Sequence, residues 1–132
     1  MLSADFNQLL SMETDDLPEI RVIHLVGECD SVTASSLGAE LSKAINDGRH
    51  VVLDTHLLTY IDSAGVAAIA TAQEALAQSR KQLRIVGAHG ILGRILRISQ
   101  LDGQIPSHET VDDAVSGINA AVTETLAPAQ AP

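Results

Sequence analysis

The sequence predicts an α/β fold, in which strands alternate with helices around a mostly parallel sheet. Apolar stretches rich in β-branched residues occupy 20–27, 50–55 and 82–88, and each is followed by apolar residues at helical spacing. Such alternation is typical of βαβ units, whose strands run parallel. The 132 residues fit one domain with a single hydrophobic core. We therefore expect one domain over 1–126, with a four- to five-stranded mixed sheet and about four helices mainly on one face.

The strand at 20–27 is expected to be the second of a hairpin. Residues 7–14 are predicted to form the first strand, and the turn between the two is expected to contain Asp15 and Asp16. A short edge strand is predicted at 104–106, where a proline cannot donate a hydrogen bond to a neighbouring strand. The sheet is therefore expected to be mixed, with one antiparallel pair at its start.

Apolar residues that recur three and four positions apart predict the helices. The predicted helices span 31–47, 63–79, 91–101 and 110–126. Gly48 stands where a helix C-terminus favours glycine, and Thr110 with Asp113 resembles a capping box. Residues 127–132 contain only Ala, Pro and Gln, and we expect them to form a disordered tail.

The composition indicates which kinds of partner suit the chain. The net charge is −9, with only 8 Lys and Arg, so nucleic acid and anionic membranes are poor partners and a basic protein surface is a suitable one. Aromatic residues make up 2%, which argues against binding single-stranded nucleic acid by base stacking. The five histidines show no metal-ligand spacing, so neither a metal nor a cofactor is expected.

The chain has the features of a cytoplasmic protein. Its start lacks the basic and apolar regions of a signal peptide, and no apolar run approaches the ~20 residues needed to span a bilayer. Cys29 is the only cysteine, which excludes an internal disulfide and argues against a structural zinc site. We therefore expect a reduced protein without membrane insertion.

Two short polar segments, "GECDS" at 27–31 and "YIDSAG" at 60–65, follow apolar strand segments. The carboxyl ends of parallel strands meet at one edge of a sheet, and α/β proteins commonly carry their functional site there. We therefore expect Asp30, Asp62 and Ser63 to lie on the same face. Asp30 has an alternative interpretation as a strand-end or helix-capping residue.

Ser63 has two interpretations. Serine is among the best helix N-caps, and spacing alone favours this role. The alternative is modification, because a phosphoryl group on Ser63 would meet the free N–H groups and the dipole of the helix N-terminus. It would add roughly −1.5 to −2 charge beside Asp62 and Asp30, which opposes the helix effect. The small residues Ala64 and Gly65 would leave the hydroxyl accessible and let a partner backbone approach.

Four segments together resemble the signatures of the STAS domain family, and more narrowly those of single-domain bacterial anti-sigma factor antagonists. These segments are "IRVIHLVGECDSVTASSL", "HVVLDTHLLTYIDSAGVAAI", "LRIVGA" and "GRILRISQLD". The resemblance extends over about residues 8–122, and its most specific element is the Asp-Ser-x-Gly sequence that begins at Asp62. Ala64 departs from many relatives, which have a second Ser or Thr there.

The resemblance implies a regulatory protein that is not an enzyme and has no catalytic residues of its own. Ser63 would be phosphorylated by an ATP-dependent anti-sigma factor serine kinase and restored by a serine phosphatase. The unphosphorylated form would bind the kinase and free a sigma factor for transcription. Asp30, Asp62, Ala64 and Gly65 would form the partner-binding surface, and a homodimer would be compatible with the family.

Two other functions fit the same resemblance. One is an accessory or scaffold subunit, either of a stress-signalling complex or of a lipid ABC transporter. The other is a nucleotide-binding module, an activity suggested for some STAS domains. The glycine-spaced "GAHGILG" at 87–93 lacks the lysine of a phosphate loop and the dinucleotide fingerprint, which argues against nucleotide binding. Gly-x-Ser-x-Gly is absent, which argues against a hydrolase.

Overall fold

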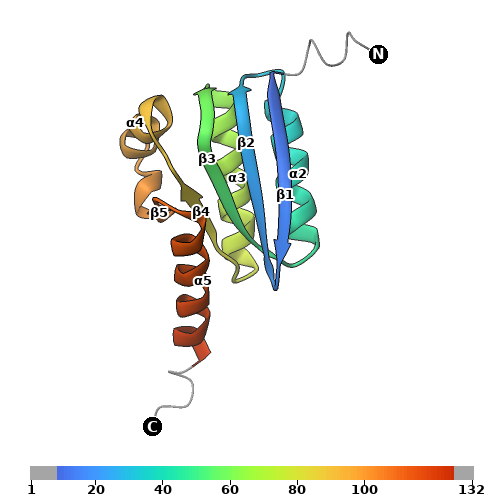
Figure 1. Ribbon diagram of the computed structural model, residues 1–132, viewed down its shortest axis with the longest axis vertical. Coiled ribbons are helices and arrows are strands. Elements are labelled where there is room, and N and C mark those ends of the chain that lie inside the picture. Colours follow the sequence, from blue (N-terminus) through green and yellow to red (C-terminus); the bar gives the residue numbers. More distant parts are fainter. Residues whose placement is uncertain (1–8, 127–132) are drawn as a thin grey trace.

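The computed structural model describes residues 9–126, in which five strands form one mixed sheet in the order β1-β2-β3-β4-β5 (Figure 1). The strands are β1 (Leu10–Leu17), β2 (Ile20–Cys29), β3 (His50–Ile61), β4 (Leu83–Val86) and β5 (Ser107–His108). β1 pairs antiparallel with β2, and the other neighbours are parallel. The mixed, mostly parallel sheet is therefore confirmed. The tail predicted at 127–132 lies outside the described residues.

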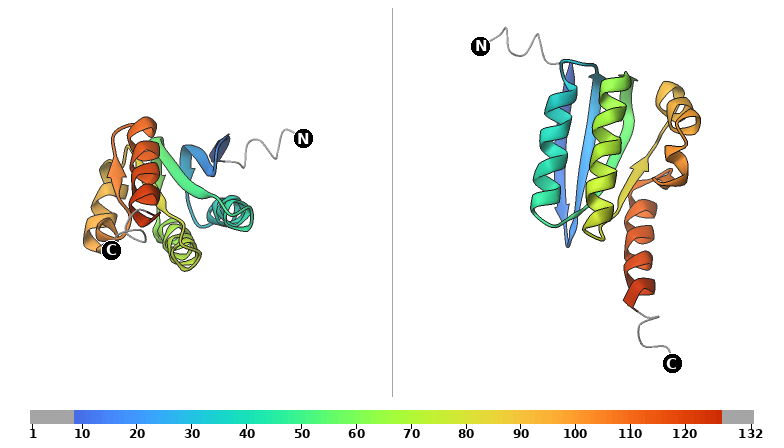
Figure 2. Two further views of the ribbon diagram at one scale, coloured as in Figure 1. Left: turned by 90° about the horizontal axis from the view of Figure 1, so that it is seen from below. Right: turned by 180° about the vertical axis from the view of Figure 1, so that it is seen from behind.

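The helices cover both faces of the sheet unequally. They are α2 (Ala34–Asn46), α3 (Ser63–Gln78), α4 (Gly90–Ile98), α5 (Val111–Leu126) and the short 3-10 helix η1 (Leu101–Gly103). α2, α3 and α4 contribute buried residues such as Leu37, Ile69 and Leu92 to the larger core. α5 packs Ala114 and Ile118 on the opposite face, in a smaller core (Figure 2). Helices mainly on one face are therefore confirmed, with α5 alone on the other among the described helices.

The turn of the first hairpin lies later than predicted. Asp15 and Asp16 belong to β1, where Asp16 stands opposite Arg21 and accepts a 2.7 Å hydrogen bond from its guanidinium. The turn is formed by Pro18 and Glu19, and Glu19 has φ 63°. Proline presets the first position of a tight turn, and the second position of a type II turn requires positive φ. The prediction of a turn at the two aspartates was wrong because ion pairing holds them in the strand.

β3 extends over 12 residues, well beyond the strand predicted at 50–55. Its second half pairs with β2 across two register shifts, and it buries Leu58 and Ile61 in the larger core. Such irregularities bend a strand and re-aim its side chains. The added length carries the chain directly to Asp62 at the edge of the sheet.

The last strand lies three residues later than predicted. β5 begins at Ser107 rather than 104, although the carbonyl of Pro106 accepts a 3.0 Å hydrogen bond from Ile85. Proline can accept but not donate in a ladder, so it stands just before the strand. The preceding helix is also shorter than predicted, because Gln100 takes φ 63° and ends the helical path.

Candidate functional site

The carboxyl ends of β2 and β3 lie side by side and carry the predicted site. Cys29 and Ile61 are register partners, and the backbone N–H of Asp62 donates a 3.1 Å hydrogen bond to the carbonyl of Cys29. Asp30 and Ser63 each follow directly after this contact. The expected juxtaposition of the two segments at one sheet edge is therefore present.

Asp62, not Ser63, is the N-cap of α3. Its backbone is extended, and its carboxylate accepts hydrogen bonds from the N–H groups of Ala64 at 3.0 Å and Gly65 at 3.3 Å. Aspartate and serine are comparably good caps, and the strand delivers the aspartate to the capping position. The interpretation of Ser63 as the cap was therefore wrong, and the serine is the first helical residue.

Ser63 is exposed at this edge. Its hydroxyl has no hydrogen-bond partner among residues 9–126. Because the cap is supplied by Asp62, replacement of the Ser63 hydroxyl would remove no internal interaction of the described chain. A group in this position is free to react with or bind an external partner.

The Asp30 side chain organises the loop before α2. Its Oδ1 accepts hydrogen bonds from the N–H groups of Val32 and Thr33, each at 3.0 Å, and from the Thr33 hydroxyl at 3.1 Å. The hydrogen bond from the Thr33 backbone is the largest of the effects that lower the pKa of Asp30. Oδ2 has no hydrogen-bond partner in the described part of the chain. Asp30 is thus an ionised loop residue with one oxygen left for a partner.

The thiol of Cys29 lies beneath the site, within the influence of the Asp30 and Asp62 carboxylates. Cys29 is 0% exposed, and burial raises the pKa of its thiol, an effect that the charges of Asp62 and Asp30 reinforce. The thiol therefore stays protonated and unreactive beneath the site. The same arrangement concentrates negative charge at the edge that carries Ser63.

Packing within the chain requires a residue without a side chain at Gly65. It is buried, and a Cβ there would lie 2.7 Å from Ile61 Cγ1 and 2.8 Å from Cys29 Sγ. Only glycine lets the first turn of α3 rest directly on the ends of β2 and β3. The expected approach of a partner backbone to this glycine does not fit its burial. Gly65 instead fixes the position of Ser63.

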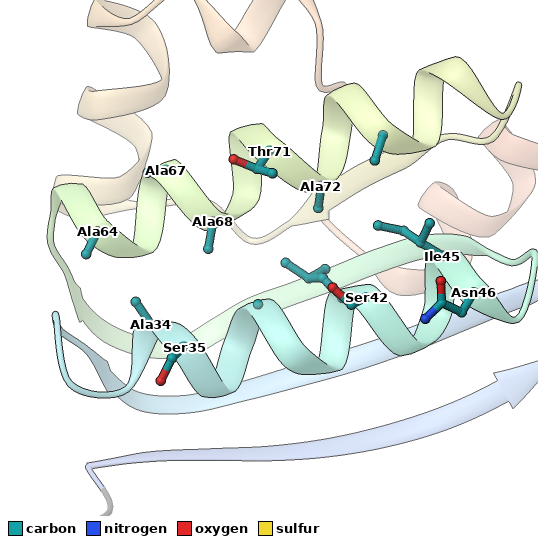
Figure 3. A pocket seen from close by; sticks show the side chains of 13 residues that line it. Ala34, Ser35, Ser42, Ile45, Asn46, Ala64, Ala67, Ala68, Thr71 and Ala72 are labelled. Carbon is teal, nitrogen blue, oxygen red and sulfur yellow. The ribbon is translucent and has the colours of Figure 1, made fainter.

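Ala64 lines a groove that the sequence did not lead us to expect. The groove has a volume of about 560 Å³ and runs between α2 and α3 (Figure 3). Its 13 lining residues include no charged side chain, and most are Ala, Ser, Thr or Gly. Small residues four apart, such as Ala64 and Ala68 on one helix and Ala34 and Gly38 on the other, were the available signal.

Two exposed apolar side chains flank the edge and were also missed. Val32 lies in the loop after Asp30 and is 73% exposed, and Tyr60 lies near the end of β3 and is 42% exposed. Large apolar residues in such positions beside a polar site are typical of protein interfaces. Within residues 9–126 no cluster of metal-ligating side chains occurs, and no helix combines the length and apolar character of a membrane span.

The family of the chain follows from comparison with known proteins. The STAS domain model matches residues 11–114, and the chain belongs to the STAS domain family. An anti-sigma-B factor antagonist of Staphylococcus aureus is 29% identical over 93 residues, which cover 70% of this chain and 86% of the relative.

Solved structures agree with this assignment. An anti-sigma factor antagonist from Mycobacterium paratuberculosis has 25% identity and a TM-score of 0.75, with coverage of 83% of this chain and 94% of that one. The Bacillus cell fate determinant SpoIIAA in its phosphorylated form shares the fold, with 20% identity, a TM-score of 0.69 and coverage of 82% and 99%. The predicted STAS-like fold is thus confirmed.

Proposed function

We propose that this protein is an anti-sigma factor antagonist whose docking to an anti-sigma serine kinase is controlled by phosphorylation of Ser63. The observation that carries the proposal is the exposed Ser63 hydroxyl, which has no partner among residues 9–126 and comes directly after the Asp62 cap. The similarity to named antagonists supports it. The unmodified form binds the kinase and thereby frees a sigma factor for transcription.

The chemistry requires one group from this chain. The kinase supplies ATP and Mg²⁺, and the Ser63 Oγ attacks the γ-phosphorus. The Oγ–P bond forms as the bond between the γ-phosphorus and its bridging oxygen breaks. ADP leaves, and the hydroxyl proton passes to a base of the kinase. The chain thus acts as substrate, and a serine phosphatase restores the hydroxyl by hydrolysis.

Phosphorylation changes the charge of the docking surface. The Asp62 carboxylate already occupies the N–H groups of Ala64 and Gly65, so the phosphate cannot take both without displacing it. The phosphate adds roughly −1.5 to −2 charge at an edge that already holds Asp62 and Asp30. It also lies where the kinase holds the phosphates of its nucleotide, and like charges repel there. Release of the phosphorylated form follows.

The remaining docking contacts come from the same edge. The free oxygen of Asp30 and the exposed carboxylate of Glu28 suit basic side chains of the kinase, and Val32 and Tyr60 supply apolar contact. Ala64 leaves the adjoining end of the α2–α3 groove open. The proposed cycle of phosphorylation and kinase binding uses cytoplasmic ATP and a sigma factor. We therefore expect the protein to act in the cytoplasm.

A phosphorylation assay tests the proposal. The purified protein is incubated with its cognate anti-sigma serine kinase and ATP, and the modified residue is identified by mass spectrometry. We expect one phosphate on Ser63 and none on Ser63→Ala, with Ser36→Ala as a control that is modified like the wild type. Absence of phosphate, or phosphate that persists in Ser63→Ala, would refute the switch.

A further inference from the structure

We infer that the outer face of α4 is a second part of the kinase-docking surface, and that the kinase presents carboxylates and apolar side chains to it. The α4 face is defined by Ile91, Arg94, Arg97 and Ile98. This inference rests on the proposed function and adds the chemistry that the partner must offer. It is carried by the exposure, the charge and the location of the four residues.

The α4 face exposes large apolar side chains on a helix whose other side is buried. Ile98 is 75% exposed and Ile91 is 49% exposed, whereas Leu92 and Leu96 are buried in the core. Ile91 and Ile98 are seven residues apart, so both lie on one side of the helix, two turns from each other. A single exposed isoleucine needs no explanation, but two on one short helix, interleaved with cations, are typical of a covered surface.

The cations of the α4 face have no side-chain partner in the described part of the chain. Arg94 and Arg97 are exposed, and their guanidinium groups form no ion pair or hydrogen bond with the described residues. By contrast, Arg21 binds both Asp16 and Asp47. The chain has 17 Asp and Glu against 8 Lys and Arg, yet within residues 9–126 no carboxylate lies at ion-pair distance from either guanidinium. A partner with carboxylates would complement them.

The location of the α4 face allows one partner to reach both surfaces. Ile91 and Tyr60 line the same small pocket, and Tyr60 lies three residues before Ser63. α4 stands beyond the end of β4, at the end of the molecule where α3 begins (Figures 1 and 2). One edge is thus acidic near Ser63 and basic on α4. Opposite charges at the two ends of a surface fix the orientation of a bound partner.

Other occupants suit the face less well. Clusters that bind anionic lipids hold about four to eight basic residues, and α4 has two on a chain of net charge −9. Pairing of α4 with α4 of a second copy would bring arginines together, which is unfavourable. Both remain as outcomes of the test.

Charge reversal on α4 tests the inference. The affinity of the kinase is measured by calorimetry, and KM and kcat are measured for Ser63 phosphorylation. We expect Arg94→Glu to weaken binding and to raise KM by about tenfold, with kcat unchanged. We expect Ile98→Ser to act in the same direction. Arg80→Glu is the control, because Arg80 is exposed in the turn between α3 and β4, at the opposite edge, and the substitution makes the same change in charge. We expect it to alter the affinity and KM by less than about twofold.

The outcomes separate this inference from the proposed function. Wild-type protein that neither binds the kinase nor accepts phosphate would refute both. Phosphorylation of Ser63 with Arg94→Glu and Ile98→Ser indistinguishable from wild type would overturn the inference alone. So would an effect of these variants confined to binding of phosphatidylserine vesicles, or to self-association in sedimentation experiments. Thermal midpoints within about 2 °C of wild type verify that the variants are folded, and Arg94→Gln provides a milder replacement.

Discussion

At the scale of single residues, Asp62 and Ser63 are both able to cap α3, but only Ser63 offers a hydroxyl. The aspartate caps α3, and the hydroxyl of the adjacent serine therefore makes no hydrogen bond within residues 9–126. A sequence with two good capping residues in succession does not show which one caps, because the choice depends on where the preceding strand ends. The family resemblance indicated the serine as the modified residue, but only the backbone geometry shows that its hydroxyl is free of the cap.

Gly65 offers a prediction at this scale. We expect Gly65→Ala to lower the free energy of unfolding by about 1–3 kcal/mol, because the new methyl would overlap Ile61 and Cys29. Gly38 is the matched control, since it is also helical and a Cβ there would contact nothing within 4 Å. Gly38→Ala should raise the free energy of unfolding by up to about 1 kcal/mol. Urea denaturation measures both, and equal effects of the two substitutions would contradict the packing account.

At the scale of elements, the order of the helices and strands follows the hydrophobic pattern, and several of their ends do not. α3 and α5 match their predicted ranges to within a residue. The hairpin turn and the length of β3 were predicted wrongly, because ion pairing of Asp16 and two register shifts against β2 decide them. The Asp16–Arg21 ion pair and the register of β3 against β2 both arise between strands. The propensity of a single segment therefore does not predict them.

The start of α3 gives a prediction that separates structure from docking. Asp62→Ala removes the cap and should lower the free energy of unfolding by about 1 kcal/mol. Asp62→Ser retains a capping oxygen and removes the charge, so its stability should stay within about 0.5 kcal/mol of wild type. Both variants lose the carboxylate from the proposed docking surface, and both should bind the kinase less tightly than wild type. Equal loss of stability in both would show that the charge, and not the cap, stabilises the helix.

At the scale of the whole molecule, His24 links three strands of the sheet. From β2, its Nδ1 lies 2.7 Å from Asp54 Oδ2 of β3, and its Nε2 lies 3.0 Å from Asp15 Oδ2 of β1. Burial lowers the pKa of His24, but the hydrogen bonds with the two carboxylates more than offset this, so the pKa is raised overall. The protonated ring therefore favours the folded state. The sequence did not predict that Asp15 would bind His24, because the two residues lie on different strands.

The sign of the resulting pH dependence follows from linkage. Since the folded pKa of His24 is raised, its stabilisation is present below the unfolded pKa and is lost as pH rises through the folded pKa. We expect His24→Gln to be less stable than wild type near pH 5.5, with the deficit shrinking above neutral pH. Urea denaturation between pH 5 and 9 measures the difference in the free energy of unfolding. A deficit that does not change with pH would contradict a charged His24.

His108 is the control with the opposite sign. Burial and the nearby Arg84 lower its pKa, so protonation opposes folding and the stability contributed by the neutral ring is lost at acid pH. His108→Gln should therefore gain stability relative to wild type as pH falls. The same denaturation series provides this comparison.

The central claim is that one hydroxyl at the edge of the sheet controls docking. Its most direct test is the affinity of the cognate anti-sigma kinase, in the presence of ADP, for the unmodified protein and for the same protein phosphorylated on Ser63. We predict that phosphorylation weakens binding by at least about tenfold, because the added charge meets both the carboxylates of this chain and the phosphates of the nucleotide. Equal affinity of the two forms, or tighter binding of the phosphorylated one, would contradict the account.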